Sequence, residues 1–255
     1  LSHNFIGALL MILLDPNNPR AGEVYSSLCE HADLSALPVT PVLGGDGWML
    51  NCIRTHGTEP IYLGLNAGHL GFLMNECEPI SEVAAELAAR KWSVHRFPRL
   101  RMEGRSSDGT EIKARAVNDI YVARTSGQSA NLRIEIDGVT AVDRLVCDGV
   151  VVATSLGSTG YNCSAGGTPC HPLLPGIHIT PISPHTPRLR SLIVPPDSVI
   201  RIEALTPERR PLQAVSDGFS HGEACEAVIR LADEVRLAFL ERHNFTEMLV
   251  RKILR

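Results

Sequence analysis

From residue 5 to residue 96, apolar runs alternate with helix-like segments, and this alternation constrains the fold more than any other feature of the sequence. Continuous apolar runs joined by helices are typical of a parallel sheet that is buried on both faces. We therefore predict an α/β domain over residues 1–97. Its expected strands are residues 5–14, 39–43 and 61–65, and its expected helices are residues 20–31, 48–56 and 80–92.

From about residue 97 to residue 239, the pattern changes to short β runs separated by turn sequences such as SSDGT, DGV and PPDS. Short strands with frequent turn signals indicate an all-β domain. We expect a β-rich, β-sandwich-like domain over residues 98–240. Its expected strands are residues 99–103, 111–124, 132–136, 144–154, 177–182 and 199–204.

The last residues, NFTEMLVRKILR, have the pattern of an amphipathic helix, with Asn244 placed to cap it and Glu247 three residues later. The apolar stripe of this helix consists of Phe245, Met248, Leu249 and Ile253. We predict that residues 241–255 form a C-terminal helix that packs back on the core. The expected fold class is thus α/β plus all-β: a Rossmann-like N-terminal domain, a β-rich domain and this helix.

Composition and charge exclude several classes of protein. Hydrophobic residues make up 44% of the chain and charged residues 20%, which are ordinary values for a soluble globular protein. The formal net charge of −4 gives no general attraction to nucleic acid or to anionic membranes, so we expect neither as a partner. Seven cysteines without a CxxC pair argue against a disulfide framework and a zinc cluster, and they favour the cytoplasm. The run FIGALLMILL is too short to span a bilayer, and we interpret it as a buried strand.

The motif GGDG, residues 44–47, follows an expected strand and precedes an expected helix. Open α/β sheets bind ligands at this place, outside the carboxyl ends of their strands, and backbone N–H groups there favour phosphate. Asp46 would repel a phosphate, so its carboxylate suits a metal or a hydroxyl that loses its proton as it attacks phosphorus. The alternative is that Asp46 caps the following helix through an Asx turn. Both interpretations stay open.

Further motifs resemble those of the ATP-NAD kinases in order and spacing over nearly the whole chain. They are GGDG (44–47), NAGHLGFL (66–73), ND (118–119), TSLGSTGYNCSAGG (154–167), HP (171–172), SPH (183–185), DG (217–218) and the terminal F-x-x-x-L-x-x-K-I pattern. The resemblance implies an enzyme that transfers the γ-phosphoryl group of ATP to the 2′-hydroxyl of the adenosine ribose of NAD, making NADP. It also implies Mg²⁺ or another divalent cation bound with ATP, and a homodimer or homotetramer. Whether polyphosphate can replace ATP stays open.

The resemblance places GGDG and NAGHLGFL beside the nucleotide. By this resemblance Asp46 is the general base toward the ribose 2′-hydroxyl, and Gly45 and Gly47 flank the nucleotide. Asn66 opens the second motif next to the same site, and Phe72 lines it. No side chains here have the spacing of a closed metal cage, so the divalent cation is expected to arrive largely with the nucleotide.

The resemblance also assigns binding residues in the β-rich part. Asn118 and Asp119 correspond to a clamp on the adenine and ribose, although an Asx turn that ends a strand is the alternative. Asp148 corresponds to an acidic position near the nicotinamide half, or else it is a turn residue of a hairpin. His221 lies near a position that contacts phosphate in the family, or else it is an ordinary surface or core histidine.

The segment 154–167 follows the apolar run VVVAT and is rich in hydroxyl groups and glycine. Such a segment either wraps a ligand or forms a plain loop. The resemblance favours the ligand and makes Thr159, Tyr161 and Ser164 nucleotide-binding residues.

Three positions depart from the family pattern. Leu156 replaces a threonine, Gly160 replaces an alanine, and Trp48 follows GGDG where threonine is commoner. Two other functions therefore stay open beside the NAD kinase reaction. One is a GGDG kinase that acts on a lipid or a sugar phosphate. The other is a non-catalytic NAD(H)-binding sensor that has lost donor binding through Trp48 and Leu156.

Overall fold

The computed structural model describes residues 11–68 and 71–253, and these divide between two units. The first unit contains the described residues up to Arg96 together with Val235–Asn244. The second contains Phe97–Glu234 together with the described residues from Phe245 onward. The expected domains, residues 1–97, 98–240 and 241–255, stay a prediction, because the two compact units are each made of two chain segments and their bounds need not be domain bounds.

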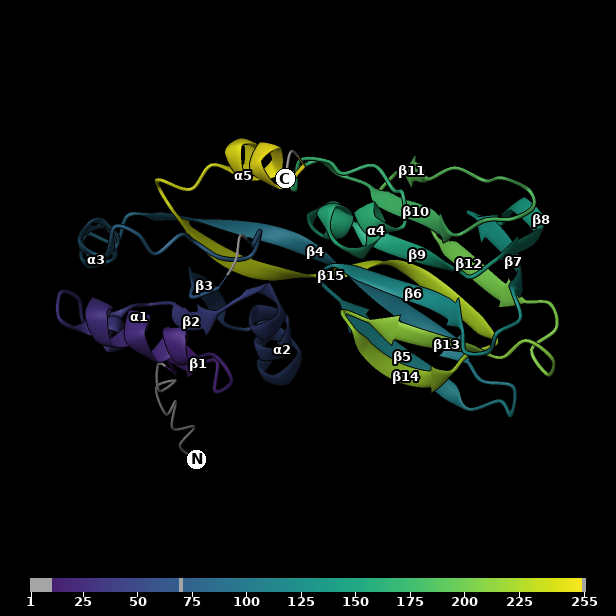
Figure 1. Ribbon diagram of the computed structural model, residues 1–255, viewed down its shortest axis with the longest axis horizontal. Helices are drawn as coiled ribbons and strands as arrows, with labels where there is room; N and C mark the ends of the chain where they lie inside the picture. The colour runs from purple at the N-terminus through teal and green to yellow at the C-terminus, as the bar shows by residue number, and fades with distance from the viewer. Residues whose placement is uncertain (1–10, 69–70, 254–255) are drawn as a thin grey trace, which may run out of the picture. The chain divides into compact units, whose positions relative to one another are not determined.

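The first unit is a parallel sheet with connecting helices (Figure 1). Its strands lie in the order β1, β2, β3, β15, and every neighbouring pair is parallel. Strands β2 and β3 are buried along nearly their whole length, which is why the sequence reads there as continuous apolar runs. The elements are β1 (Leu13–Leu14), α1 (Pro19–Cys29), η1 (Leu34–Ala36), β2 (Thr40–Gly44), α2 (Asp46–His56), β3 (Ile61–Asn66), α3 (Ile80–Ala88) and the end of β15 (Glu226–Leu240). Residues 5–10 of the first expected strand lie outside the described residues.

The second unit is built from two layers of strands around one apolar core. One layer is an antiparallel sheet in the order β11-β10-β9-β6-β13-β14: β6 (Asp119–Arg124), β9 (Gly149–Thr154), β10 (Ile177–Ile182), β11 (Leu192–Val194), β13 (Leu212–Ser216) and β14 (Phe219–Glu223). The other contains β4 (Trp92–Arg105) from Phe97 onward, β5 (Glu111–Ala116), β7 (Ala130–Ile136), β8 (Val139–Cys147), β12 (Ile200–Ala204) and the start of β15. Val152 and Ile179 from the first layer join Ile134 and Ile200 from the second in one buried cluster. The expectation of a β-rich, sandwich-like part is confirmed.

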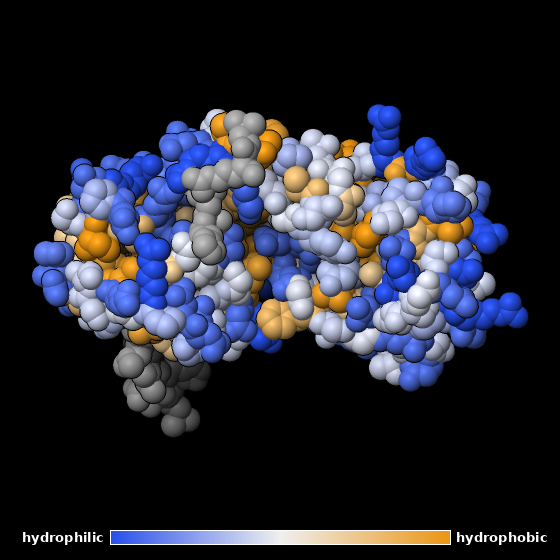
Figure 2. Space-filling view, in the orientation of Figure 1, coloured by the Kyte–Doolittle hydropathy of each residue, from blue (hydrophilic) through white to orange (hydrophobic). Residues whose placement is uncertain are grey.

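The strands of the second unit show the alternation that a half-buried sheet requires. In β5, exposed and buried residues alternate along the whole strand. Hydrophilic side chains accordingly make up much of the surface visible in Figure 2. No helix in the described part of the chain combines the length and the hydropathy needed to cross a membrane.

Several expected elements end or break elsewhere. The helix expected over 80–92 ends at Ala88, because Arg90 has a positive φ of 54° and Trp92 already begins β4. The strand expected over 111–124 is two strands, β5 and β6, which belong to different layers. The strand expected over 144–154 is likewise divided at Asp148 into β8 and β9. Strands β11, β13, β14 and β15 were not expected at all.

The C-terminal helix is α5 (Phe245–Ile253), as the sequence predicts. Phe245 and Met248 are buried, and the Phe245 ring meets the edge of the Phe97 ring at a centroid distance of 6.2 Å. Ile253, expected on the same apolar stripe, is 51% exposed. The buried contact therefore involves the first turns of the helix and not its last.

Candidate functional site

Asp46 lies at the carboxyl end of β2, in the first turn of α2. Gly45 is the N-cap of this helix, in an extended conformation, and no hydrogen bond from a described side chain caps it. The Asp46 carboxylate accepts two backbone hydrogen bonds instead, from Phe72 N to Oδ2 at 2.9 Å and from Leu73 N to Oδ1 at 3.0 Å. The capping alternative therefore does not hold, and α2 begins two residues earlier than expected, which places Gly47 in its first turn.

These two hydrogen bonds connect GGDG to the segment that follows β3. Each carboxylate oxygen receives one N–H, and the N-terminal end of α2 adds a favourable dipole, so the negative charge of Asp46 is stabilised in place. Gly71 makes the approach possible, because a Cβ at this position would lie 2.2 Å from Asp46 Oδ1. Gly71 belongs to the NAGHLGFL motif but was not among the predicted site residues.

Asn66 ends β3 directly beside the GGDG motif. It is the parallel partner of Gly44, and the next residue, Ala67, donates its N–H to the Gly44 carbonyl at 2.8 Å. The Asn66 side chain accepts a hydrogen bond from Gly68 N at 2.8 Å, which shapes the turn that leaves the strand. The Phe72 side chain is buried, with 2% exposure. The structure thus brings Asp46, Asn66 and Phe72 together in the first unit.

Trp48 has a packing role in the same region. Its indole N–H donates to the Leu13 carbonyl at 3.3 Å, which ties α2 to β1. A Cβ on Gly44 would lie 2.9 Å from Trp48 Cδ1, so the indole packs directly against this glycine. The departure from the family pattern at this position is therefore accommodated by Gly44.

In the second unit, Asn118 and Asp119 lie where the chain passes from β5 to β6. Asp217 holds this passage from the turn between β13 and β14. Its carboxylate accepts N–H bonds from Val117 (2.7 Å), Asn118 (2.8 Å) and Asp119 (3.2 Å), and its own N–H donates to the Asp119 carbonyl (3.0 Å). Asp217 adopts a positive φ of 47°, a conformation that aspartate tolerates in tight turns.

Thr154, at the end of β9, holds the same passage from the other side. Its hydroxyl donates to the Val117 carbonyl at 2.7 Å, and its N–H donates to the Asn118 carbonyl at 2.9 Å. Its hydroxyl also accepts the N–H of Gly157 at 3.1 Å. A Cβ on Gly157 would lie 2.2 Å from the Asn118 carbonyl oxygen, so only glycine fits. The simple Asx turn is thus an incomplete description of Asn118, since its backbone is fixed by distant residues.

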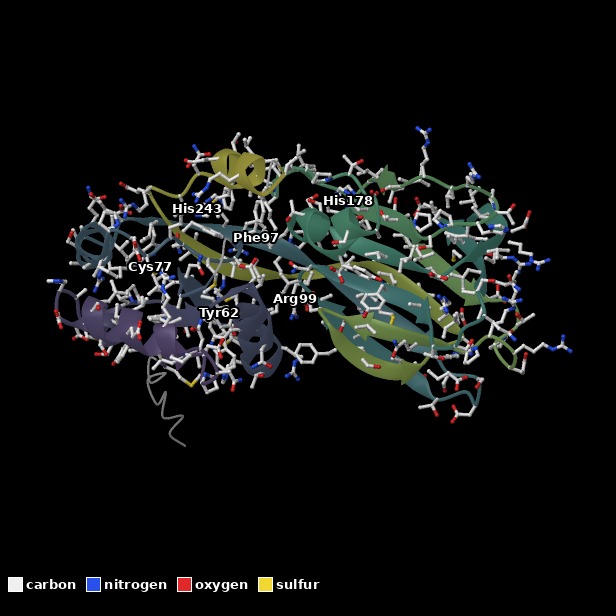
Figure 3. All side chains as sticks on the ribbon, viewed as in Figure 1. Tyr62, Cys77, Phe97, Arg99, His178 and His243 are labelled. Atoms are coloured by element: carbon white, nitrogen blue, oxygen red, sulfur yellow. The ribbon has the colours of Figure 1, made fainter. Side chains whose placement is uncertain are left out.

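The Asp119 side chain is only 7% exposed. Burial, and after it the negative charge of Asp217, raise the pKa of Asp119 to about 7. Burial also raises the pKa of Asp217, but its three backbone N–H donors and the positive charge of Arg99, labelled in Figure 3, act in the opposite direction. The N–H donors thus favour the charged form of Asp217, whereas burial and the charge of Asp217 favour the protonated form of Asp119.

Tyr161 is the tyrosine of the 154–167 segment and the first residue of α4 (Tyr161–Ser164). Its ring meets the Tyr121 ring edge-on, with a centroid distance of 4.9 Å and an interplanar angle of 67°. Burial and then the charge of Asp119 raise the pKa of the Tyr161 phenol, which places these two side chains in one electrostatic environment. With 39% exposure, Tyr161 still offers an aromatic face to a ligand.

The other expected residues of this segment lie on either side of Tyr161. Thr159 is the last residue of η2 (Leu156–Thr159), and Ser164 is exposed, with its hydroxyl 3.5 Å from the Gly160 carbonyl. A Cβ on Gly160 would lie 4.0 Å from Asp119 Oδ2, which is ordinary contact, and 3.3 Å from the Gly157 carbonyl, which is tight. Leu156 is 4% exposed, so it serves as a packing residue where the family has a hydroxyl.

Asp148 lies apart from Asn118 and Asp119. It separates β8 from β9, which belong to different layers, so the hairpin alternative does not hold. Its carboxylate forms two bonds with the Arg124 guanidinium, from Nε to Oδ1 at 2.6 Å and from Nη2 to Oδ2 at 3.3 Å. Because Arg124 is the last residue of β6 and Asp119 the first, these two acidic residues lie at opposite ends of one strand.

His221 lies on β14, and its Nε2 is 2.6 Å from the hydroxyl of Ser216 on β13. Burial lowers the pKa of His221, which favours the neutral imidazole. The histidine is therefore at least a partner of Ser216, and its contact with phosphate stays a prediction.

Comparisons with known proteins identify the family. The model of the ATP-NAD kinase C-terminal domain matches residues 117–227. The chain is 35% identical over 248 residues to the NAD kinase of Zymomonas mobilis, with 93% of each protein covered, and 36% identical over 226 residues to that of Brucella suis, with 86% of each covered. The chain belongs to the ATP-NAD kinase family. As a member of this family it is a kinase, and the prediction of the family is confirmed.

Solved structures agree with the assignment to the ATP-NAD kinases. Yeast NADH kinase complexed with NADH matches with a TM-score of 0.81 at 24% identity, covering 96% of this chain and 86% of that one. An NAD kinase from Archaeoglobus fulgidus in complex with ATP matches with a TM-score of 0.75 at 25% identity, covering 96% and 98%. The predicted order of an α/β part, a β-rich part and a C-terminal helix is confirmed.

Four residues that were not predicted as site residues leave room for, or hold in place, another residue of the ATP-NAD kinase motifs. Gly71 admits the Asp46 carboxylate, and Thr154, Gly157 and Asp217 fix the backbone of Asn118. Each belongs to a motif that carries the family resemblance, but the motif does not say which residue it contacts.

Proposed function

We propose that this chain transfers the γ-phosphoryl group of ATP to the 2′-hydroxyl of the adenosine ribose of NAD. The observation that carries the proposal is the Asp46 carboxylate, held by the backbone N–H groups of Phe72 and Leu73 at the start of α2. A carboxylate oxygen that accepts an N–H bond can also accept a hydroxyl proton. Asp46 is thus equipped as the base of the reaction.

The reaction we propose needs positioning more than covalent chemistry. As the ribose oxygen bonds to the γ-phosphorus, the bond from phosphorus to the β–γ bridging oxygen breaks and ADP leaves, while Asp46 takes the hydroxyl proton. Gly45 and Gly47 leave the helix terminus open for a phosphate, because neither carries a side chain and a Cβ at either would meet no atom within 4 Å. The divalent cation proposed for this site, Mg²⁺, would neutralise phosphate charge.

For the metal, the chain's own contribution is small in this proposal. Among the residues that the structure describes, no group of three His, Cys, Asp or Glu side chains could hold an ion. Mg²⁺ keeps several waters and is commonly bound through one or two carboxylates and substrate phosphates. A lone carboxylate such as Asp46 fits an ion that arrives with ATP.

The NAD-binding residues are proposed from the second unit. Asn118 offers an amide for the adenine edge, and Asp119, with a pKa of about 7, can donate as an acid or accept as a carboxylate toward the ribose diol. Tyr161 supplies an aromatic face for stacking, and Thr159 and Ser164 supply hydroxyl groups. Asn66 and Phe72 line the reacting end in the first unit. Asp148 and His221 are proposed contacts of the nicotinamide half and of phosphate, respectively.

Assembly and location complete the proposal. We propose a homodimer or homotetramer, which size-exclusion chromatography with light scattering would resolve. We also propose a cytoplasmic enzyme, a location supported by seven cysteines that are all free.

The test is to incubate the protein with NAD, ATP and Mg²⁺ and to measure NADP with an NADP-specific dehydrogenase. Asp46→Asn should lower kcat by roughly 10²–10⁴ while NAD affinity stays within a few-fold. Asp33→Asn is the matched control, because Asp33 also accepts a backbone N–H, from Ser35 at 3.0 Å, in the same unit. Turnover of Asp46→Asn within a few-fold of wild type would reject the base. Tight NAD binding without NADP formation by the wild type would instead indicate a sensor, and turnover of a lipid or a sugar phosphate would indicate the other kinase class.

A further inference from the structure

A cavity of about 600 Å³ lies in the second unit, at the end of β6 opposite Asp119. Its lining residues are Gln128, Asn131, Arg144, Thr206, Arg209 and Arg210. All six are polar, and three carry a positive charge. Cavities of 300–1,000 Å³ are of the size that binds small molecules.

The sheet register places this cavity at the far end of β6 and β13. Leu212 pairs with Arg124 and Ser216 pairs with Ile120, so these two strands are antiparallel. Asp217 and Asp119 therefore lie at one end, and the segments that hold Gln128 and Arg210 lie at the other, the right-hand end of the pair in Figure 1. A strand of this length spans about 17–20 Å. The cavity is thus separate from the Asn118–Asp119 passage.

The three arginines of the cavity have no acidic partner. Within residues 11–68 and 71–253, no carboxylate forms an ion pair with Arg144, Arg209 or Arg210. Arg210 is nevertheless oriented, because its Nη1 donates to the carbonyl and, at 2.8 Å, to the hydroxyl of Ser129. Its remaining N–H groups are free to serve a ligand, and a guanidinium has five such donors in a fixed geometry.

Two further polar groups in this cavity lack partners. Asn131 is only 7% exposed, and its Oδ1 is buried with no hydrogen-bond partner among the described residues. The same holds for Thr206 Oγ1. Most buried polar groups in proteins are hydrogen-bonded, so these two atoms beside the cavity are exceptions. The Thr206 hydroxyl and the Asn131 amide N–H groups can both donate hydrogen bonds.

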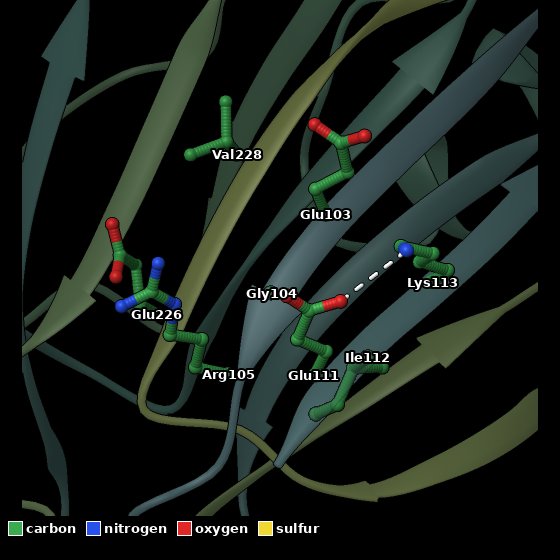
Figure 4. A pocket seen from close by; sticks show the side chains of 8 residues that line it. All are labelled: Glu103, Gly104, Arg105, Glu111, Ile112, Lys113, Glu226 and Val228. Carbon is green, nitrogen blue, oxygen red and sulfur yellow. Dashed lines mark ion pairs between the residues drawn. The ribbon is translucent and has the colours of Figure 1, made fainter. Parts of the chain in front are cut away.

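A second cavity of the second unit, about 380 Å³, makes an informative contrast (Figure 4). Its three glutamates are each paired with a basic residue: Glu111 with Lys113 at 3.2 Å, Glu226 with Arg201 at 3.0 Å, and Glu103 with Arg101. Charged residues of both signs therefore line that cavity, whereas those that line the arginine cavity are all positive.

We propose that the arginine cavity binds a small anion with two or more linked phosphates. Guanidinium groups bind phosphate oxygens through paired N–H donors, and three of them match an anion of charge about −3 better than a single phosphate. Inorganic di- or triphosphate and the phosphate chain of a nucleotide share this chemistry. The site needs no kinase activity, and none of its residues belongs to the site proposed for NAD or ATP.

The test is calorimetric titration of the protein, held in saturating NAD, with inorganic tripolyphosphate, with ADP and with orthophosphate. The double variant Arg144→Ala/Arg209→Ala is compared with Arg188→Ala/Arg190→Ala, which removes two equally positive, exposed arginines outside the cavity. Tripolyphosphate affinity should fall at least about tenfold in the cavity variant only, since each lost charge-assisted contact corresponds to about a factor of ten. ADP binding that is weakened in the cavity variant only would identify the cavity as a nucleotide site, and ADP binding that is equal in both double variants would leave it an inorganic one.

Asn131→Asp provides a second, independent test. The substitution keeps the side-chain shape but places a negative charge opposite the arginines, so the variant should fold, bind NAD normally and lose tripolyphosphate binding. Orthophosphate binding as tight as tripolyphosphate would overturn the proposed ligand class. The proposal would be overturned entirely by wild type that binds no tripolyphosphate, by equal losses in the two double variants, or by unchanged affinity in Asn131→Asp.

Discussion

The buried Asp119 makes the stability of this kinase depend on pH, and Asp119→Asn should remove that dependence. The carboxyl is 7% exposed, and burial together with the charge of Asp217 raises its pKa from 3.8 to about 7. In the unfolded chain the same group ionises near its ordinary value. Between these two pKa values the folded protein therefore holds a proton that the unfolded chain has released.

The sign and the size follow from this difference. Since the folded state binds the extra proton, the free energy of unfolding falls as pH rises from about 4 and levels off above about 7. Each pKa unit corresponds to about 1.4 kcal/mol, so the full loss is about 4 kcal/mol, of which about 2–3 kcal/mol falls between pH 5 and pH 8.5. Asparagine cannot ionise. Between pH 5 and pH 8.5, the unfolding free energy of wild type should therefore fall by about 2–3 kcal/mol more than that of Asp119→Asn.

The assay is urea unfolding followed by circular dichroism at pH 5, 7 and 8.5. Histidines whose pKa values are lowered by burial also titrate in this range, but they are common to both proteins and cancel in the difference. Asp108→Asn is the matched control in the same unit, because hydrogen bonds lower the pKa of Asp108 to about 2, well below the window. Its pH dependence should parallel that of wild type.

Parallel curves for wild type and Asp119→Asn would refute the reasoning, since they would mean that Asp119 ionises in the folded state as it does in the unfolded chain. A curve for Asp108→Asn that followed Asp119→Asn would be equally damaging, because it would trace the effect to total charge.

Three further changes have defined outcomes. Gly71→Ala places a Cβ 2.2 Å from Asp46 Oδ1, so it should cost about 1–3 kcal/mol of unfolding free energy and lower kcat, as urea titration and initial rates would show. Asp217→Ala leaves backbone N–H groups around Asn118 unpaired, and NAD affinity measured by calorimetry should fall by at least about 1–3 kcal/mol. Leu156→Thr restores the family hydroxyl but should lower the unfolding free energy by about 1–3 kcal/mol, because Leu156 is buried. NAD affinity would be measured on the same variant, and an unchanged unfolding free energy would contradict the prediction.

The parallel half of the fold was predictable because strands that are buried on both faces appear in the sequence as continuous apolar runs. β2 and β3 lie within one residue of the expected bounds, since their apolar runs are short and bounded by turn residues. β15 was missed because it serves two environments: its first residues alternate between buried and partly exposed, with charged residues among them, and its last four are buried. Neither the alternating pattern of a half-buried strand nor the continuous apolar run of a fully buried strand holds over the whole length of β15.

The candidate site residues could be named from the sequence, but their contacts could not. Asp46, Asn118 and Asp119 stand in short motifs that sequence reading can find. The role of Asp217 depends on a carboxylate that reaches the backbone N–H groups of residues about a hundred positions earlier, from a turn with a positive φ. No local pattern encodes such a contact, because it exists only once β6 and β13 are paired.

The acid among the glycines of GGDG thus has a physical explanation. A carboxylate beside phosphates is repelled by them, and it can persist there only if other groups stabilise its charge. For Asp46 these are the N–H groups of Phe72 and Leu73, one for each oxygen. For Asp217 they are the N–H groups of Val117, Asn118 and Asp119, and the Asp217 carboxylate fixes the backbone of these residues in turn. The carboxylate of Asp46 is thus held at the start of α2, where it can act as a proton acceptor, whereas the carboxylate of Asp217, which accepts three N–H groups, is suited to position Asn118 and Asp119.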